Sequence, residues 1–154
     1  MTDTIISVQN LRYRYPTGAQ PVLQGMHLIV RPGEFIGLVG STGAGKTTFC
    51  QSLNGLIPHY TQGELSGTVH IDGHDTARAS VAELAATVGL VFQDADAQLV
   101  MSTVEEECLF GPLSHGLPRH EAHARVRETM AMLEIEHLAA RSPQTLSGGQ
   151  KQRV

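Results

Sequence analysis

The chain has 154 residues, a formal net charge of −4 and 41% hydrophobic residues. This length suits one domain, and the composition is that of a globular protein rather than a disordered one. The acidic balance argues against nucleic acid as the main partner, because proteins that bind the phosphate backbone are usually basic. Cys50 and Cys108 favour a reducing compartment over a disulfide framework. We see no spanning segment of about 20 apolar residues and no signal peptide, so we expect any work at a membrane to need a partner.

The N-terminal part, residues 5–39, is predicted to be β structure, because short apolar or alternating segments are separated by turn signals. Extended segments are expected at 6–15, 26–30, 34–39 and 68–71, the last running into the turn Asp72-Gly73. Between the apolar run Glu34–Val39 and a helix expected from about Gly45 to Leu53 lies a segment rich in glycine.

Helices dominate the second half. Ser80 with Glu83, and Ser102 with Glu105, have the spacing of capping boxes and predict helices over 81–87 and 104–110. Between these helices, the run Val88–Phe92 is predicted to be a second buried segment. A longer helix is expected to open at Pro118, and its apolar face consists of Ala122, Val126, Met130 and Leu133.

The glycine-rich segment matches the phosphate-loop pattern G-x-x-x-x-G-K-[ST] in full. Its glycines let the backbone approach an anion closely, and the following helix N-terminus favours negative charge. Lys46 can reach the β- and γ-phosphates of a nucleotide, and the Thr47 hydroxyl is a hard ligand suited to Mg²⁺. The predicted ATP-contacting residues of the loop are Gly40, Ser41, Thr42, Gly43, Ala44, Gly45, Lys46, Thr47 and Thr48. The loop alone does not choose among kinases, GTPases and transport ATPases.

A second motif makes that choice. The pentapeptide LSGGQ consists of Leu146, Ser147, Gly148, Gly149 and Gln150, and Ser147 has the side chain of a helix cap. With this signature downstream of a phosphate loop, the chain resembles the ABC ATPase family. The resemblance implies an α/β P-loop NTPase of ABC type, whose mixed sheet has an N-terminal antiparallel β part beside a helical subdomain. Residues 1–154 would be a partial domain: a nucleotide-binding core over 1–92, then the Q-loop, helical subdomain and signature over 93–154.

The resemblance also implies roles for single residues. The signature would face the γ-phosphate held by a second ABC ATPase subunit, identical or paralogous, with ATP and Mg²⁺ between the subunits. Gln93 looks like the Q-loop glutamine that joins the Mg²⁺ site to a membrane partner. Tyr15 resembles the aromatic residue that stacks on adenine. Tyr13 is the other candidate for this stacking residue, and the alternative interpretation of Tyr13 is a tyrosine buried in the core.

Further segments resemble the ATPases of energy-coupling factor (ECF) importers, which take up vitamins or transition-metal ions. They are Leu53–His59, Gly63–Leu65, Val91–Leu99 and Ser102–Glu107 leading into Phe110–Pro112, with Ala95 at a position where relatives often have proline. This similarity implies a peripheral subunit at the cytoplasmic face of the membrane, with a transmembrane coupling subunit docking near Asp94–Pro112. A conventional ABC transporter and a soluble ABC protein acting on ribosomes or DNA remain the alternatives, and the short segment without heptads argues against the second.

After the signature, the family has a buried strand with an Asp and a catalytic Glu, then a D-loop and a switch histidine. No residue here occupies those positions, so we assign no catalytic base and expect the C-terminal strands to be missing. As a partial domain, the chain is expected to bind ATP without hydrolysing it at a transport rate, and to be poorly stable alone. The histidines, including His115, His120 and His123, are expected on the surface rather than around a metal.

Overall fold

The computed structural model describes residues 4–94 and 98–154. The chain divides into two compact units, residues 1–90 and 91–154. This division falls close to the boundary expected between residues 92 and 93. Each unit has its own hydrophobic core, so each is described here by itself.

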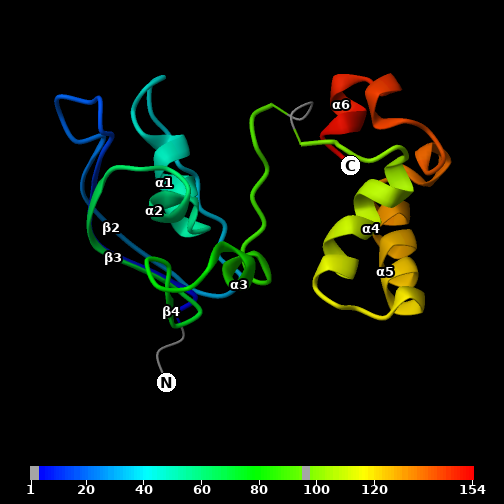
Figure 1. Cartoon of the computed structure of the whole chain (residues 1–154), viewed down its shortest axis with the longest axis horizontal. Helices are drawn as coiled ribbons and strands as arrows, with labels where there is room; N and C mark the ends of the chain where they lie inside the picture. Colours follow the sequence, from blue (N-terminus) through cyan, green and yellow to red (C-terminus); the bar gives the residue numbers. More distant parts are fainter. Residues whose placement is uncertain (1–3, 95–97) are drawn as a thin grey trace. The chain divides into compact units, whose positions relative to one another are not determined.

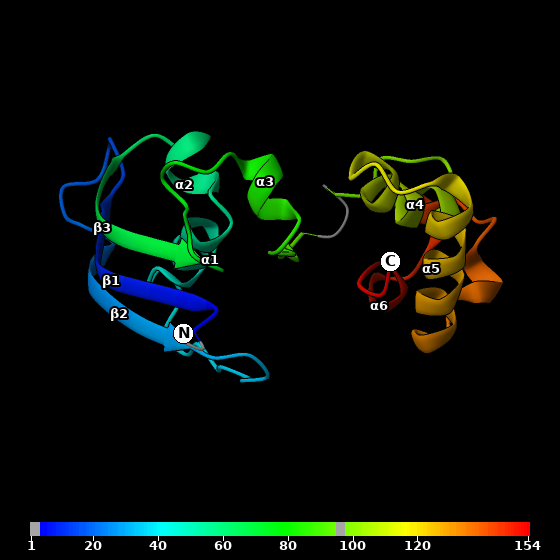
Figure 2. The ribbon, with the colours of Figure 1, turned by 90° about the horizontal axis from the view of Figure 1, so that it is seen from below.

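The first unit is built on an antiparallel sheet whose strands lie in the order β2-β1-β3-β4 (Figures 1 and 2). The strands are β1 (Ile6–Arg14), β2 (Leu23–Val30), β3 (Glu64–Ile71) and β4 (His74–Asp75). β1 pairs with both β2 and β3, and the Asp72-Gly73 turn joins β3 to β4. The N-terminal β structure predicted from the alternating pattern and the antiparallel arrangement implied by the resemblance are therefore both confirmed.

Three helices pack against this sheet: α1 (Lys46–Leu53), α2 (Leu56–His59) and α3 (Val81–Ala85). The sheet contributes most of the buried side chains of the core, and each helix adds one. From the helices these are Phe49, Ile57 and Leu84, which meet Val8, Leu11, Tyr13, Leu23, Val69 and Ile71 of the sheet. This packing fixes the start of α1, where the phosphate loop ends, against the strands.

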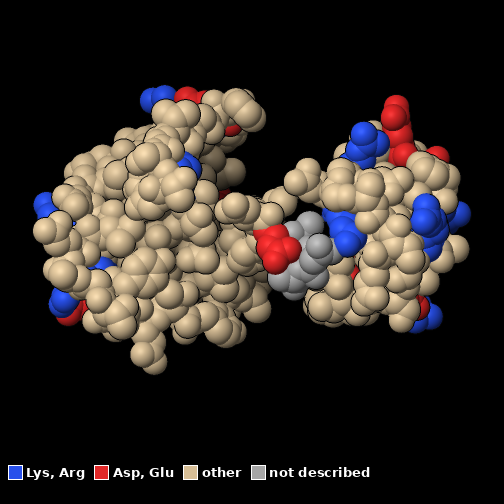
Figure 3. Space-filling model, turned by 90° about the horizontal axis from the view of Figure 1, so that it is seen from above, with Lys and Arg blue, Asp and Glu red and all other residues tan. Residues whose placement is uncertain are grey.

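The second unit is helical, with α4 (Val104–Ser114), α5 (Arg119–Met132), η1 (Glu136–Leu138), η2 (Pro143–Thr145) and α6 (Gly148–Lys151). α4 and α5 lie side by side (Figures 1 and 2). Of the face predicted for α5, Ala122, Val126 and Met130 are buried, but Leu133 ends the helix and is 41% exposed. Charges of both signs lie over this unit, whereas the first unit is largely free of them on the face that Figure 3 shows.

The two apolar runs predicted as buried segments do not form strands in the described chain. In the run Glu34–Val39, Phe35 is 98% exposed and Val39 is 90% exposed. In the run Val88–Phe92, Val91 is 81% exposed. A strand is stabilised by hydrogen bonds to its neighbours, and among the described residues neither run has a strand beside it. The prediction that they are buried here is therefore wrong.

The capping box of α4 also differs from the prediction. Thr103, not Ser102, begins the helix, and its hydroxyl accepts a hydrogen bond from the Glu106 N–H. The Glu106 carboxylate accepts one from the Thr103 N–H in return. The predicted box of α3, Ser80 with Glu83, is present. Among the helices of the described chain, none is long and apolar enough to cross a membrane.

Candidate functional site

The phosphate loop reaches α1 through two glycines in left-handed backbone conformations. Gly43 has a φ of 83° and Gly45 a φ of 94°, a region that costs other residues energy. Gly45 has a second constraint, because a Cβ there would lie 3.0 Å from Cγ1 of Val22 and 3.2 Å from Cδ2 of Leu23. Glycine therefore lets α1 begin in direct contact with the start of β2.

The N-terminus of α1 is open. Gly45 has no side chain to cap the helix, and no side chain of the described residues does so in its place. The first N–H groups of a helix have no acceptor within the helix and carry partial positive charge. The Lys46 ammonium adds a full charge and donates hydrogen bonds to the carbonyl oxygens of Gly40 and Ser41, each at 2.8 Å. The arrangement suits an anion with several oxygens, such as a polyphosphate.

The two threonines after Lys46 face different surroundings. Thr47 is exposed beside the loop, so its hydroxyl is accessible to a ligand. Thr48 is 5% exposed, and its Oγ1 lies 3.0 Å from the hydroxyl oxygen of Tyr15 in a hydrogen bond. Both were predicted to contact ATP, but of the two only Thr47 is exposed.

The two candidate tyrosines also differ in environment. Tyr13 is 0% exposed in the core, and its hydroxyl donates to the carbonyl oxygen of Gln62 at 2.7 Å. Burial raises the pKa of Tyr13, and the neighbouring Tyr15 raises it further. Tyr15 is only partly buried and touches the edge of this core. A fully buried ring cannot stack on a base, so Tyr15 is the one of the two tyrosines that remains available.

The signature residues form the start of α6 in the second unit. Leu146 is 6% exposed and anchors the segment in the core. Ser147 and Gln150 make a capping box: the Ser147 N–H donates to Oε1 of Gln150 at 3.0 Å, and the Gln150 N–H donates to Oγ of Ser147 at 3.4 Å. Gly148 and Gly149 are exposed, and a Cβ at either would meet no atom within 4 Å in the described structure.

The predicted Q-loop lies at the beginning of the second unit. Gln93 is exposed and lies in an irregular segment, and Ala95 falls outside the described residues. The N–H of Phe92 donates to Oε1 of Gln98 at 3.1 Å. Farther along, the Glu107 carboxylate accepts from the N–H groups of Val100 and Met101 at 2.8 and 2.7 Å. Sequence analysis did not predict this role of Glu107, because no spacing of residues in the sequence indicates a hydrogen bond to an irregular loop.

The three consecutive glutamates in the first turn of α4, Glu105–Glu107, and the histidine His123 have structural partners. Glu106 belongs to the capping box, and Nδ1 of His123 lies 3.3 Å from Oε1 of Glu105, which joins α5 to α4. Among the described residues, no three His, Cys, Asp or Glu side chains gather as a metal site would require. Mg²⁺ prefers few protein oxygens together with phosphates and water, and the exposed Thr47 carries one hard oxygen of that kind.

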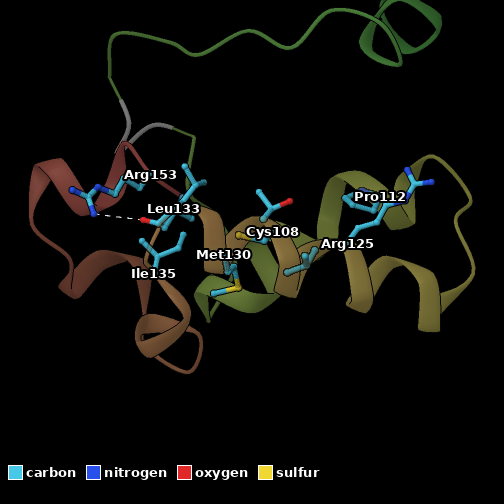
Figure 4. Close-up of a pocket in the computed structure, with 10 residues that line it drawn as sticks. Cys108, Pro112, Arg125, Met130, Leu133, Ile135 and Arg153 are labelled. Carbon is cyan, nitrogen blue, oxygen red and sulfur yellow. Dashed lines mark hydrogen bonds between the residues drawn. The ribbon is translucent and has the colours of Figure 1, made fainter.

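A cavity of about 340 Å³ lies in the second unit between α4, α5 and the end of the chain (Figure 4). Its lining is mainly apolar, with Cys108, whose pKa is raised by burial and by Glu107. Its two arginines are engaged: Arg125 pairs with Glu121 at 2.8 Å, and Arg153 donates to the carbonyl oxygen of Leu133 at 3.5 Å. These features do not fit a polyphosphate, unlike the N-terminus of α1.

The model of the ABC transporter family matches residues 23–154, a span that includes both the phosphate loop and the signature. A protein of Pyrococcus abyssi named as an ABC transporter ATP-binding protein is 43% identical over 150 residues. A protein of Caldanaerobacter subterraneus with the same kind of name is 43% identical over 155 residues. The chain belongs to the ABC transporter family and is an ATP-binding domain of it.

Two solved structures share the fold. One is cbiO1 from Clostridium perfringens, part of the ABC transporter complex cbiONQ, with 33% identity and a TM-score of 0.81 over 98% of this chain. The other is a dimeric ATP-binding cassette in a post-hydrolysis state bound to ADP and phosphate, with 27% identity and a TM-score of 0.78 over 96% of this chain. These matches confirm the predicted ABC ATPase fold.

The relatives are longer than this chain. It spans 54% of the Pyrococcus protein and 27% of the Caldanaerobacter protein. It also spans 59% of the cbiO1 chain and 66% of the dimeric cassette. The activity and partners of a whole protein are therefore taken up as proposals below.

Proposed function

We propose that this chain is the ATP-binding part of a subunit that powers an ECF-type ABC importer of vitamins or transition-metal ions. The observation that carries the ATP site is the uncapped N-terminus of α1, with Lys46 beside it. Family membership adds ATP as the ligand, and the dimeric relative holds the products ADP and phosphate.

Within this site, the residues have distinct tasks. The Lys46 ammonium exchanges its two loop carbonyls for oxygens of the β- and γ-phosphates, which are stronger partners because they are charged. Thr47 offers its hydroxyl to the Mg²⁺ that accompanies the nucleotide. Tyr15 offers the free face of its ring to adenine. The loop glycines Gly43 and Gly45 keep the backbone N–H groups accessible.

The signature supports the proposal of a second ATPase subunit. Gly148 and Gly149 weaken a helix by about 1 kcal/mol each relative to alanine. Nothing in the described chain requires glycine at these two positions, because a Cβ atom at either would lie in open space. Close approach of the partner's nucleotide accounts for both glycines. The dimeric cassette among the similar structures agrees with this arrangement.

The membrane partner would dock on the segment Asp94–Pro112, as the resemblance implies. Two of its large apolar side chains are exposed: Val100 at 72% and Phe110 at 54%. Such side chains suit an apolar contact with a coupling helix. The similarity to cbiO1, which is part of a transporter complex, favours the ECF type over a conventional ABC transporter. In this arrangement the subunit lies at the cytoplasmic face of the membrane, with Gln93 as its Q-loop glutamine.

Hydrolysis is proposed for the whole protein, with the water-activating carboxylate supplied by the segment that the family places after the signature. We therefore expect the 154-residue chain to bind MgATP but to show no sustained turnover. Sustained release of phosphate that is lost in Lys46→Ala would contradict this expectation.

The binding step is tested by calorimetric titration of this chain with MgATP. Saturable binding that Lys46→Ala removes is expected, and binding unchanged in that variant would overturn the site. The importer class is tested by reconstituting the whole protein with the membrane subunits encoded beside it. ATP-dependent uptake of a metal ion or vitamin would support the ECF type, whereas uptake of another solute would support a conventional transporter.

A further inference from the structure

A hydrogen bond joins the predicted base-binding residue to the helix that carries the phosphate loop. The hydroxyl oxygens of Tyr15 and Thr48 lie 3.0 Å apart. Tyr15 follows the end of β1, and Thr48 lies in the first turn of α1. Thr48 is 5% exposed, so its side chain faces the core rather than the open helix terminus. This bond links the two parts of the site that would hold the base and the phosphates.

The ring of Tyr15 is held from two sides. Tyr13 meets it edge-on, with ring centroids 4.9 Å apart and planes at 84°. Tyr13 is itself fixed, because it is buried and its hydroxyl is bonded to Gln62. The hydroxyl end of Tyr15 is held by Thr48. Since Tyr15 lies beyond the last residue of β1, these side-chain contacts set the tilt of its ring.

We propose that Thr48 is a positioning residue for Tyr15, fixing the ring at the orientation and distance from the phosphate loop that a nucleoside triphosphate requires. The inference rests on the proposed ATP site. Its consequence is specific to ligands with a flat base: a base stacks on the ring, whereas inorganic tripolyphosphate contacts only the loop. Loss of the hydrogen bond between the two hydroxyls therefore weakens the binding of a nucleoside triphosphate and leaves the binding of tripolyphosphate unchanged.

Tyr15→Phe isolates the bond, because phenylalanine keeps the ring and its stacking area. A net hydrogen-bond contribution of the usual size predicts a loss of about threefold to tenfold in affinity for MgATP. Affinity for tripolyphosphate with Mg²⁺ is expected to stay the same. Tyr60→Phe is the matched control, since Tyr60 is 76% exposed and lies away from this pair. Thr48→Ser keeps the hydroxyl and is expected to retain affinity for MgATP.

The chain also supplies a spectroscopic readout, because it contains three tyrosines and no tryptophan. Adding MgATP is expected to change tyrosine emission, because adenine stacks on Tyr15. Adding tripolyphosphate is expected to leave the emission unchanged. Thr48→Val removes the hydroxyl but keeps the size and branching of the side chain. At saturating MgATP its emission change is expected to fall, while Thr48→Ser restores it.

The double variant Tyr15→Phe/Thr48→Val tests the pairing directly. If the Thr48 side chain contacts a phosphate, Thr48→Val also loses affinity for tripolyphosphate. This loss is subtracted from the loss of MgATP affinity before the single and double variants are compared. The remaining loss for MgATP is expected to equal that of Tyr15→Phe alone. Additive losses, or Tyr15→Phe binding MgATP like the wild type, would overturn the positioning role while leaving the ATP site intact. Failure of the wild type to bind either ligand would overturn both proposals.

Discussion

The α-helices of the described chain begin in different ways, and α5, which follows Pro118, has no side-chain cap. α3, α4 and α6 each start with a capping box, formed by Ser80 with Glu83, Thr103 with Glu106, and Ser147 with Gln150. α1 starts instead with Gly45, and no side chain of the described residues caps it. α2 also follows a glycine, but there the carboxamide oxygen of Asn54 accepts from the Leu56 N–H at 3.2 Å.

The lack of a cap alone does not distinguish α1, since α5 also lacks one, but the surroundings of the α1 terminus do. A capping box satisfies N–H groups that would otherwise need water or an anion. At α1 these groups stay open, a cation lies beside them, and the backbone takes left-handed conformations that keep the loop in place. At α6 the cap is present, and the space beside Gly148 and Gly149 is open, as the proposed contact with a partner's nucleotide requires.

The largest expected effect comes from removing the cation at the open terminus. Lys46→Ala is expected to weaken MgATP binding about tenfold to a hundredfold, as loss of charge-assisted hydrogen bonds predicts. Calorimetry on the purified chain measures this loss. Arg78→Ala is the matched control, since the Arg78 side chain is 88% exposed and pairs with Asp75 at 3.5 Å. An equal loss in both variants would show that net charge, not the position of Lys46, holds the nucleotide.

Next in size is the effect of placing a side chain at Gly45, the residue directly before α1. Gly45→Ala forces a Cβ onto a residue with φ of 94° and into contact with Val22. We expect the free energy of unfolding to fall by about 1–3 kcal/mol and MgATP binding to weaken, measured by chemical denaturation and calorimetry. Gly37→Ala should do neither, because a Cβ there meets no atom within 4 Å in the described structure. Equal stability of the two variants would contradict the close approach of α1 to β2.

Replacing a glycine of the signature with alanine is expected to stabilise the chain, in contrast to Gly45→Ala. Gly149→Ala places alanine in the exposed start of α6, where space is open, so the free energy of unfolding is expected to rise by up to about 1 kcal/mol. In the whole protein, the same change is expected to lower ATP-dependent dimerisation, measured by light scattering. A destabilised chain would show instead that the glycine serves packing within this subunit.

How far the sequence predicts these features depends on whether they are local. The helix after the phosphate loop, the capping box of α3 and the cap by Ser147 follow from spacings of a few residues, and they form as predicted. For α4, both Ser102 and Thr103 precede a Glu by three positions. Contacts from a distant segment decide the register, because Val104 and Glu105 donate their N–H groups to the carbonyl oxygens of Arg141 and Ala139.

Features that depend on distant neighbours were not predictable in the same way. The apolar runs around Phe35 and Val91 have the composition of buried strands, but burial needs an adjacent strand and none lies beside them in the described chain. Similarly, Tyr13 and Tyr15 share one segment, and only packing shows that the first is in the core. Gln93 and the docking surface remain predictions from resemblance, because their roles depend on molecules outside this chain.

The smallest expected effect concerns a capped helix, through the capping box of α3. The Ser80 N–H and hydroxyl donate to the Glu83 carboxylate and hold the pKa of Glu83 below its ordinary value. Because the folded-state pKa is lowered, the box stabilises the chain above the ordinary pKa of glutamate, and the contribution is lost as pH falls through the folded-state value. Ser80→Ala is expected to raise the pKa of Glu83 toward its ordinary value and to weaken this acid sensitivity. An NMR titration of the Glu83 side chain measures the shift, and an unchanged pKa in Ser80→Ala would show that the Ser80 hydroxyl does not hold the carboxylate in solution.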